Sequence, residues 1–304
     1  MKRKFLTMVA LILSVSLMTV LFGCSTNKTA ENEKKEFVLC YLPSEAAEQY
    51  KESRSQLADA LEQAIGMKIV EVNATDFNGT VEAMRTGKAD MAYFGPLTYA
   101  QAQERVAVEP LVVYGKDGDK ANAVYYCYLV ANAKDDSIRS IKDVEGKVMA
   151  FADPNSTSGN LVPSYEIMKA FPELNLTMDD LHIGGAFFES VSFSGAQKAG
   201  LQAVANGDVD VVPAASMTYD GEMKAGNISE ENVKIIYTSD AIPGSPWTIR
   251  SELDNELKQK VKEFLLNYEN DAYFEEFHGD PGRYLECSPD EYKEIIDLNN
   301  RLQP

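Results

Sequence analysis

The chain has 304 residues and a formal net charge of −18 at pH 7, because 47 Asp and Glu residues outnumber 29 Lys and Arg residues. Such an acidic chain argues against nucleic acid as a partner, although an anion can still bind where N–H groups and helix ends make a site locally positive. The length suits two modest domains in one chain.

The N-terminus has the order of a secretory signal of the lipoprotein kind. Three basic residues at positions 2–4 precede an uncharged apolar run over 5–22, and Gly23 and Cys24 follow. A membrane anchor is the alternative, but the run is at the short end for a span, and a small residue before a cysteine fits cleavage and lipidation. We expect a signal peptide over 1–23, and its removal would take away the three basic residues and bring the net charge to −21.

The segment that follows is polar and shows no apolar periodicity. We expect residues 24–36 to be a flexible tether, because such a composition buries too little surface to offset the entropy of ordering. With lipid on Cys24, the folded part, from about Phe37 to Leu302, would stand outside the cell and be anchored to its membrane.

The first half of the folded part alternates short apolar runs with amphipathic segments. The predicted strands are 37–42, 68–72 and 89–93, and the predicted helices are 44–65 and 77–86. This order is typical of a parallel sheet with right-handed crossovers.

The same alternation starts again after a β-rich run at 125–130. The predicted strands are 147–151, 181–183, 209–212 and 233–237, and the predicted helices are 160–171, 196–206, 252–268 and 289–302. If the C-terminal segment completes the first lobe, the chain crosses between lobes near Tyr125 and near 233–237.

We therefore predict a two-lobed α/β fold, each lobe a mostly parallel sheet flanked by helices. Lobe I comprises 37–126 and 236–304, and lobe II comprises 127–235. Ligands of open α/β sheets lie beyond the carboxyl ends of strands. The loops expected to line a cleft between the lobes are 43–45, 74–77, 94–97 and 153–159.

The loop Asp153–Gly159 lies between a predicted strand and a predicted helix. Its Ser156, Thr157 and Ser158 place hydroxyl groups and free first-turn N–H groups at a helix N-terminus, where an anion is favoured. An ordinary helix cap explains the same residue types, so local composition leaves both interpretations open.

The segment Asp153–Pro163 resembles the signature of the phosphate/phosphite/phosphonate ABC-transporter substrate-binding proteins. Further blocks similar to this family occur in order at 76–77, 82–85, 88–96, 203–210 and 242–246. The resemblance implies a type II periplasmic-binding-protein fold, a small oxyanion ligand (phosphite, phosphate or a small phosphonate such as methylphosphonate) and an ABC-transporter permease as partner. It implies no cofactor and no catalytic residue.

Carried over residue by residue, the resemblance implies that Ser156–Ser158 hold the oxyanion and that Tyr93 and Phe94 form a wall from the opposite lobe. Phe77 matches a position where the family often has tyrosine, and phenylalanine keeps the wall without the hydroxyl donor. Gln197 falls where the family commonly has histidine, and its amide donates hydrogen bonds but adds no charge by titrating.

Two more candidates come from the predicted elements. Ser44 lies in the loop after the first strand, and Tyr125 belongs to a tyrosine cluster that alternates at strand period, so that one of its faces belongs to the core. Both are candidate ligand contacts.

The resemblance also bears on what the ligand carries. In members that take an aminated phosphonate it implies carboxylates near the positions matching Met217 and Ser245, and neither residue offers one. We therefore expect a small ligand without a cationic tail, unless Asp220 or Glu222 supplies the charge in a shifted register.

Other chemistry finds less support. His182 and His278 have no cysteine or carboxylate spacing typical of zinc, so we expect no metal. The three cysteines besides Cys24 are an odd number, so at least one stays free, and we expect no disulfide framework. These cysteines are Cys40, Cys127 and Cys287.

Three alternative functions remain. A secreted serine hydrolase would need a Gly-x-Ser-x-Gly elbow, which the sequence lacks, and a positioned base. The same fold could instead bind a sulfonate, a thiamine precursor or an amino acid. An adhesin or envelope structural protein would need an exposed apolar surface. For the binding protein we expect a monomer.

Overall fold

The structure, a computed structural model, describes residues 36–45 and 48–302. The predicted signal peptide, Cys24 and nearly all of the predicted tether therefore lie outside the described residues. No helix in these two ranges is long and apolar enough to cross a membrane.

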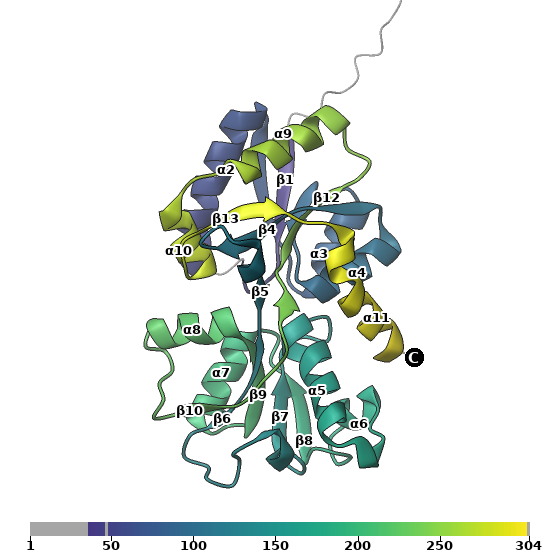
Figure 1. The fold of residues 1–304 in the computed structure, drawn as a ribbon, viewed down its shortest axis with the longest axis vertical. Helices are drawn as coiled ribbons and strands as arrows, with labels where there is room; N and C mark the ends of the chain where they lie inside the picture. Colours follow the sequence, from purple (N-terminus) through teal and green to yellow (C-terminus); the bar gives the residue numbers. More distant parts are fainter. Residues whose placement is uncertain (1–35, 46–47, 303–304) are drawn as a thin grey trace, which may run out of the picture. The chain divides into compact units, whose positions relative to one another are not determined.

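A six-stranded sheet forms the upper part of the fold in Figure 1, with the strand order β13-β4-β12-β3-β1-β2. Its strands are β1 (Glu36–Tyr41), β2 (Lys68–Asn73), β3 (Met91–Tyr93), β4 (Val108–Lys116), β12 (Pro246–Arg250) and β13 (Gly282–Glu286). Its helices are η1 (Glu48–Tyr50), α2 (Lys51–Ile65), α3 (Phe77–Arg85), α4 (Pro96–Arg105), α9 (Asn255–Leu266), α10 (Asp271–His278), η6 (Pro289–Tyr292) and α11 (Lys293–Leu302).

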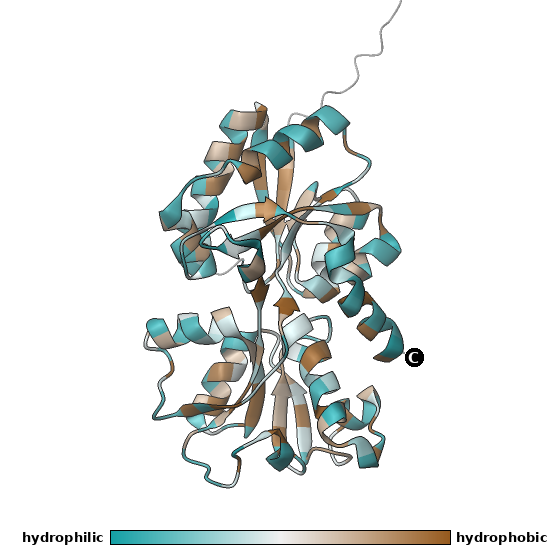
Figure 2. Ribbon diagram, viewed as in Figure 1, coloured by the Kyte–Doolittle hydropathy of each residue, from teal (hydrophilic) through white to brown (hydrophobic). Residues whose placement is uncertain are grey.

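Both faces of this sheet are covered, which explains why its first strand is apolar along most of its length. Phe37, Leu39 and Tyr41 pack with α2, α9 and α10, whereas Cys40, which points to the other face, packs with α3 and α4. Gly66 ends α2 with φ 70°, a left-handed conformation that glycine adopts without strain. Figure 2 shows apolar residues along the strands and polar ones on the outer helix faces.

A five-stranded sheet forms the second part, with the order β10-β6-β9-β7-β8. Its strands are β6 (Cys127–Asn132), β7 (Val148–Phe151), β8 (Ser190–Phe193), β9 (Val211–Ala215) and β10 (Val233–Thr238). Its helices are η3 (Ile141–Asp143), the π-helical turn η4 (Thr157–Leu161), α5 (Val162–Ala170), η5 (Pro172–Leu174), α6 (Met178–His182), α7 (Gln197–Asn206) and α8 (Ser216–Lys224).

The chain passes between the two sheets beside a short antiparallel ribbon. The ribbon consists of β5 (Val124–Tyr125) and β11 (Ile242–Pro243), and η2 (Lys120–Asn122) lies just before β5 in the chain. An apolar cluster surrounds the ribbon and joins residues of both parts, among them Leu97, Tyr125, Leu161 and Ile295.

Two expectations about secondary structure need correction. Residues 181–183 are not a strand, because Thr177 and Asp180 form a capping box that starts α6, and β8 takes the edge of the sheet instead. The sheets are mixed rather than mostly parallel. In the six-stranded sheet β1 pairs in parallel with β2 and β3, but β12, β4 and β13 add antiparallel pairs. In the five-stranded sheet β7 pairs in parallel with β8 and β9, whereas β6 pairs antiparallel with β9 and β10.

The return crossing also lies later than expected. Strand β10 pairs with β6 as far as Thr238, so residues 236–238 belong to the five-stranded sheet.

Candidate functional site

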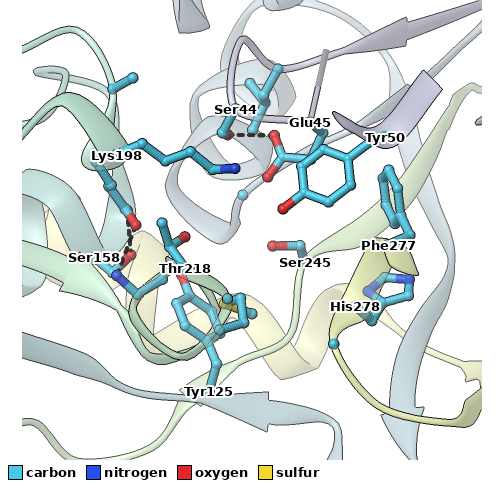
Figure 3. A pocket seen from close by; sticks show the side chains of 18 of the residues that line it. Ser44, Glu45, Tyr50, Tyr125, Ser158, Lys198, Thr218, Ser245, Phe277 and His278 are labelled. Atoms are coloured by element: carbon cyan, nitrogen blue, oxygen red, sulfur yellow. Dashed lines mark hydrogen bonds between the residues drawn. The ribbon is translucent and has the colours of Figure 1, made fainter. Parts of the chain in front are cut away.

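A cavity of about 340 Å³ lies between the two sheets and is lined from both sides. The six-stranded sheet contributes the loop after β1 and the end of β3, and the other sheet contributes the turn after β7 and the start of α7 (Figure 3). Eight of the nine predicted ligand-binding residues line it: Ser44, Phe77, Tyr93, Tyr125, Ser156, Thr157, Ser158 and Gln197.

Phe94 is the exception. Its side chain is fully buried in the apolar cluster that contains Cys40 and Tyr99, and it is absent from the cavity lining. Successive side chains of a strand point to opposite faces, so Tyr93 and Phe94 cannot both face the cavity. Phe94 therefore does not form the wall expected for it.

The turn Ser156–Ser158 holds three hydroxyl groups that differ in their partners. Ser156 caps the helix by accepting a hydrogen bond from Gly159 N at 3.1 Å. Thr157 Oγ1 accepts from Leu97 N, in the facing half, at 2.9 Å, and Ser158 Oγ accepts from Gln197 Nε2 at 3.0 Å. Each oxygen thus takes a donor and keeps its own proton to donate. We call these three residues the hydroxyl cradle.

Close packing behind the cradle explains a glycine in the motif. A Cβ atom on Gly159 would lie 2.5 Å from Ala152 Cβ and 2.7 Å from Ser156 Oγ, far inside contact distance. The chain can pass this close to β7 only because residue 159 has no side chain.

Gln197 orients the cradle. Its Oε1 accepts a hydrogen bond from Ala215 N at 2.8 Å, while its Nε2 donates to Ser158 Oγ. Because a backbone N–H can only donate, the amide must point its oxygen toward Ala215 and its nitrogen toward Ser158. Gln197 therefore holds Ser158 as an acceptor, so that the serine proton points away from Gln197, toward Tyr125 or a ligand.

Two buried tyrosines complete the wall. Tyr125 and Tyr93 are each 6% exposed, and burial raises the pKa of both phenols. The hydroxyl of Tyr125 interacts with the side chains of Ser158 and Thr157, and that of Tyr93 with Ser245. Both phenols therefore stay protonated at neutral pH and can donate to an anion.

Charged side chains in the lining were missed by the sequence analysis. Lys198 follows Gln197 in α7, and its Nζ lies 3.3 Å from Glu222 Oε1 and 5.1 Å from the ring centroid of Tyr50. Glu45 follows Ser44, whose Oγ donates to its Oε2 at 2.5 Å. The predicted loop at 43–45 did point to this side of the cleft, but no sequence signal paired it with Lys198.

The ionisation of Glu45 reflects its position. Its side chain is half-buried in the lining, and this burial raises its pKa, with the Ser44 hydrogen bond and the charge of Lys198 acting in the opposite direction. The two acids that the sequence left open, Asp220 and Glu222, are not part of the lining, although Glu222 contacts Lys198.

The histidines do not supply positive charge to the cradle. His278 lines the cavity, stacks on Tyr114 with ring centroids 4.1 Å apart, and has its pKa lowered to about 3 by burial. The Nε2 of His182 bonds Asn160 Oδ1 at 2.7 Å, outside the lining. The structure places no metal-binding group of three or more His, Cys, Asp or Glu residues in the described ranges.

Comparison with known proteins gives a consistent result. Residues 39–292 match the family described as "ABC transporter, phosphonate, periplasmic substrate-binding protein". The chain is 33% identical over 250 residues to the phosphate-import protein PhnD of Mycolicibacterium smegmatis, covering 82% of this chain and 76% of the relative. It is 28% identical over 270 residues to the phosphonates-binding periplasmic protein of Escherichia coli, covering 85% of this chain and 75% of the relative.

Solved structures share the fold. PhnD1 of Prochlorococcus marinus, in complex with methylphosphonate, superposes with a TM-score of 0.75 at 17% identity, covering 88% of this chain and 98% of the other. A binding-protein component of an ABC phosphonate transporter from Pseudomonas aeruginosa superposes with a TM-score of 0.74 at 24% identity, covering 88% of this chain and 86% of the other. The predicted two-lobed α/β fold, of the type II periplasmic-binding-protein class, is therefore confirmed.

Proposed function

Because the chain belongs to the family of periplasmic substrate-binding proteins of phosphonate ABC transporters, we propose that it binds a small phosphorus oxyanion and delivers it to an ABC-transporter permease. Phosphite, phosphate and a small phosphonate such as methylphosphonate are the proposed ligands. One relative is named for phosphate import, and a structural neighbour holds methylphosphonate.

The observation that carries this proposal is the geometry of the hydroxyl cradle. Ser158 and Thr157 accept hydrogen bonds from Gln197 and from Leu97 N and lie beside the Tyr125 hydroxyl, so this group of three hydroxyls has more protons to donate than acceptors of its own at one end of the cavity. A tetrahedral oxyanion offers several acceptors to such donors, and each hydrogen bond to a charged group contributes about 1.5–3 kcal/mol.

Calorimetric titration of the purified protein tests the ligand class. We expect saturable binding of phosphite, phosphate or methylphosphonate, and weaker binding of sulfate and methanesulfonate. Tighter binding of methanesulfonate than of every phosphorus oxyanion would contradict the proposal and favour a sulfonate receptor with the same fold.

We further propose that the protein acts by binding rather than by hydrolysis. A nucleophilic serine needs a positioned base, and the hydrogen-bond partners of the two histidines are Asn160 and Tyr284 rather than a cradle serine. Turnover of a chromogenic phosphomonoester at an enzymatic rate would contradict this.

The proposed location is outside the cell, with lipid on Cys24 and residues 24–36 as tether. The basic and apolar order before Gly23–Cys24 supports it. In membrane fractionation of the full chain, we expect the wild type to partition into the detergent phase and the Cys24→Ala variant to remain in the aqueous phase. Equal partitioning of both would exclude lipid on this residue.

A further inference from the structure

Lys198 brings a largely buried ammonium group to the lining of the cavity. Only 24% of the side chain is exposed, and Nζ itself is buried without a hydrogen bond to any residue that the structure describes. Glu222 Oε1 lies 3.3 Å away as an ion-pair partner. A lysine ammonium carries three donors, and leaving them unused away from water is costly.

Two carboxylates lie near Lys198, and each already accepts a hydrogen bond at one of its two oxygens. Glu222 Oε2 accepts a hydrogen bond from Asn227 Nδ2 at 2.9 Å, and Glu45 Oε2 accepts one from Ser44. The Tyr50 ring supports the cation from the facing lobe but offers no hydrogen-bond acceptor in the ring plane. The surroundings thus hold the ammonium in place by an ion pair and a ring contact, without accepting a hydrogen bond from it.

The position of Lys198 in its helix is itself unfavourable. It is the second residue of α7, whose N-cap, Ala196, provides no side-chain cap. The N-terminus of a helix carries partial positive charge, so a lysine in the first turn is opposed by the helix dipole. Local violations of this kind are expected at functional positions.

The cavity has room beyond the cradle. A water molecule takes about 30 Å³ in the liquid, so the five heavy atoms of methylphosphonate need roughly 150 Å³ at similar packing, less than half of the 340 Å³ present. Figure 3 shows Lys198 and Glu45 turned toward each other on the side of the cavity away from Tyr125. Lys198 is part of the cavity lining, so a ligand that extends from the cradle along this wall comes close to its side chain.

We propose that Lys198 is a ligand-binding residue that donates to an oxygen atom carried on the carbon chain of a substituted phosphonate, while the cradle holds the phosphonate head. This rests on the proposed function and narrows its ligand class to oxygen-bearing phosphonates. Because Glu222 already balances the charge of Lys198, a neutral hydroxyl oxygen suits the site better than a carboxylate. Lys198 then discriminates between phosphonates by what lies beyond the first carbon.

Titration of three ligands tests the proposal, with 2-aminoethylphosphonate as a fourth, cationic comparison. Methylphosphonate has no distal oxygen, 2-hydroxyethylphosphonate has a neutral one, and phosphonoacetate has a charged one. We expect wild-type protein to bind 2-hydroxyethylphosphonate about tenfold or more tightly than methylphosphonate, the factor that one hydrogen bond to a charged donor contributes. In Lys198→Met the two dissociation constants should agree within about threefold, and Lys198→Arg should retain part of the preference.

The matched control is the exposed Lys260 on α9, far from the lining, where Lys260→Met should leave the preference intact. Melting curves establish that each variant is folded, and Lys198→Ala replaces the Met variant if that one is unfolded. A preference for phosphonoacetate that also depends on Lys198 supports the site with a charged acceptor.

Three outcomes overturn the proposal. The first is equal wild-type affinity for all three ligands, and the second is a preference for 2-hydroxyethylphosphonate that survives in Lys198→Met. The third is tightest binding of 2-aminoethylphosphonate, which would mean that Glu45 rather than Lys198 binds the substituent. Failure of the proposed function looks different, since no phosphonate, phosphite or phosphate would then bind at all.

Discussion

Ser156 and Ser158 have the same side chain two positions apart, but the structure gives them different tasks. Ser156 Oγ caps the helix, whereas Ser158 Oγ is held by Gln197 at the cavity. We expect Ser158→Ala to weaken methylphosphonate binding by about 1.5–3 kcal/mol, roughly ten- to two-hundredfold, with little change in melting temperature.

The comparison with Ser156→Ala makes this prediction specific. Loss of the cap should lower the free energy of unfolding by about 1 kcal/mol. Calorimetry and thermal melting on both variants measure the two quantities. If Ser158→Ala lowers stability and leaves affinity unchanged, Ser158 is a structural residue only.

Gln197 offers a test that depends on pH. In Gln197→Glu, Ala215 N can still donate to the carboxylate, but the second oxygen becomes an acceptor facing Ser158, which must then donate its proton to the new carboxylate instead of the ligand. We expect affinity to fall more than tenfold at pH 8. Protonation of the new carboxyl restores a donor, so the ratio of variant to wild-type dissociation constants should shrink toward pH 5.

Gln197→Met is the control, because it removes the donor without adding charge and its ratio should not change with pH. Taking the ratio to the wild type at each pH cancels the ligand's own titration. A flat ratio for Gln197→Glu would show that Gln197 does not orient Ser158.

At the scale of elements, the turn between β7 and α5 depends on one close approach. A Cβ on Gly159 meets Ala152 Cβ at 2.5 Å, so Gly159→Ala should lower the free energy of unfolding by about 1–3 kcal/mol, as overpacking does. It should also weaken binding, because the cradle residues precede the displaced backbone. Chemical denaturation and titration measure both effects.

Gly221, within α8, is the matched control. No atom lies within 4 Å of a Cβ built there and its φ is not positive, so Gly221→Ala should leave stability unchanged or raise it by up to about 1 kcal/mol. Equal stability of the two alanine variants would refute the packing argument for Gly159.

For the whole molecule, the cavity is lined from both sheets, and the chain passes between them beside β5 and β11. We propose lobe I as 37–126 plus the C-terminal segment after the ribbon, and lobe II as the five-stranded sheet with its helices. Ligand that contacts both lobes favours the closed arrangement over an open one. Small-angle scattering should therefore show a smaller radius of gyration with saturating methylphosphonate.

The control for this measurement is the same titration on Ser158→Ala at a ligand concentration below its dissociation constant, where the radius should not change. An unchanged radius for the saturated wild type would argue against hinge closure.

The sequence alone determined those features of the fold that depend on short stretches of residues. Alternating strands and helices predicted a two-lobed α/β fold. The Ser156–Ser158 motif was compatible with a helix cap or an anion site, and the family resemblance of its segment led us to predict the anion site. A short apolar run fits a strand or a helix equally well, so residues 181–183 were predicted as a strand, whereas a capping box makes the segment helical. The antiparallel strands were also missed, because pairing direction follows from the path of the chain between distant segments.

Only the tertiary structure decided which side chains meet across the cavity. Tyr93 faces it and Phe94 does not, because the Phe94 side chain packs with α3 and α4 on the other face of the sheet. Lys198 and Glu45 are far apart in the chain and come together because the first turn of α7 faces the loop after β1. Such contacts depend on how two sheets and their helices stack, and no periodicity along one segment contains that information.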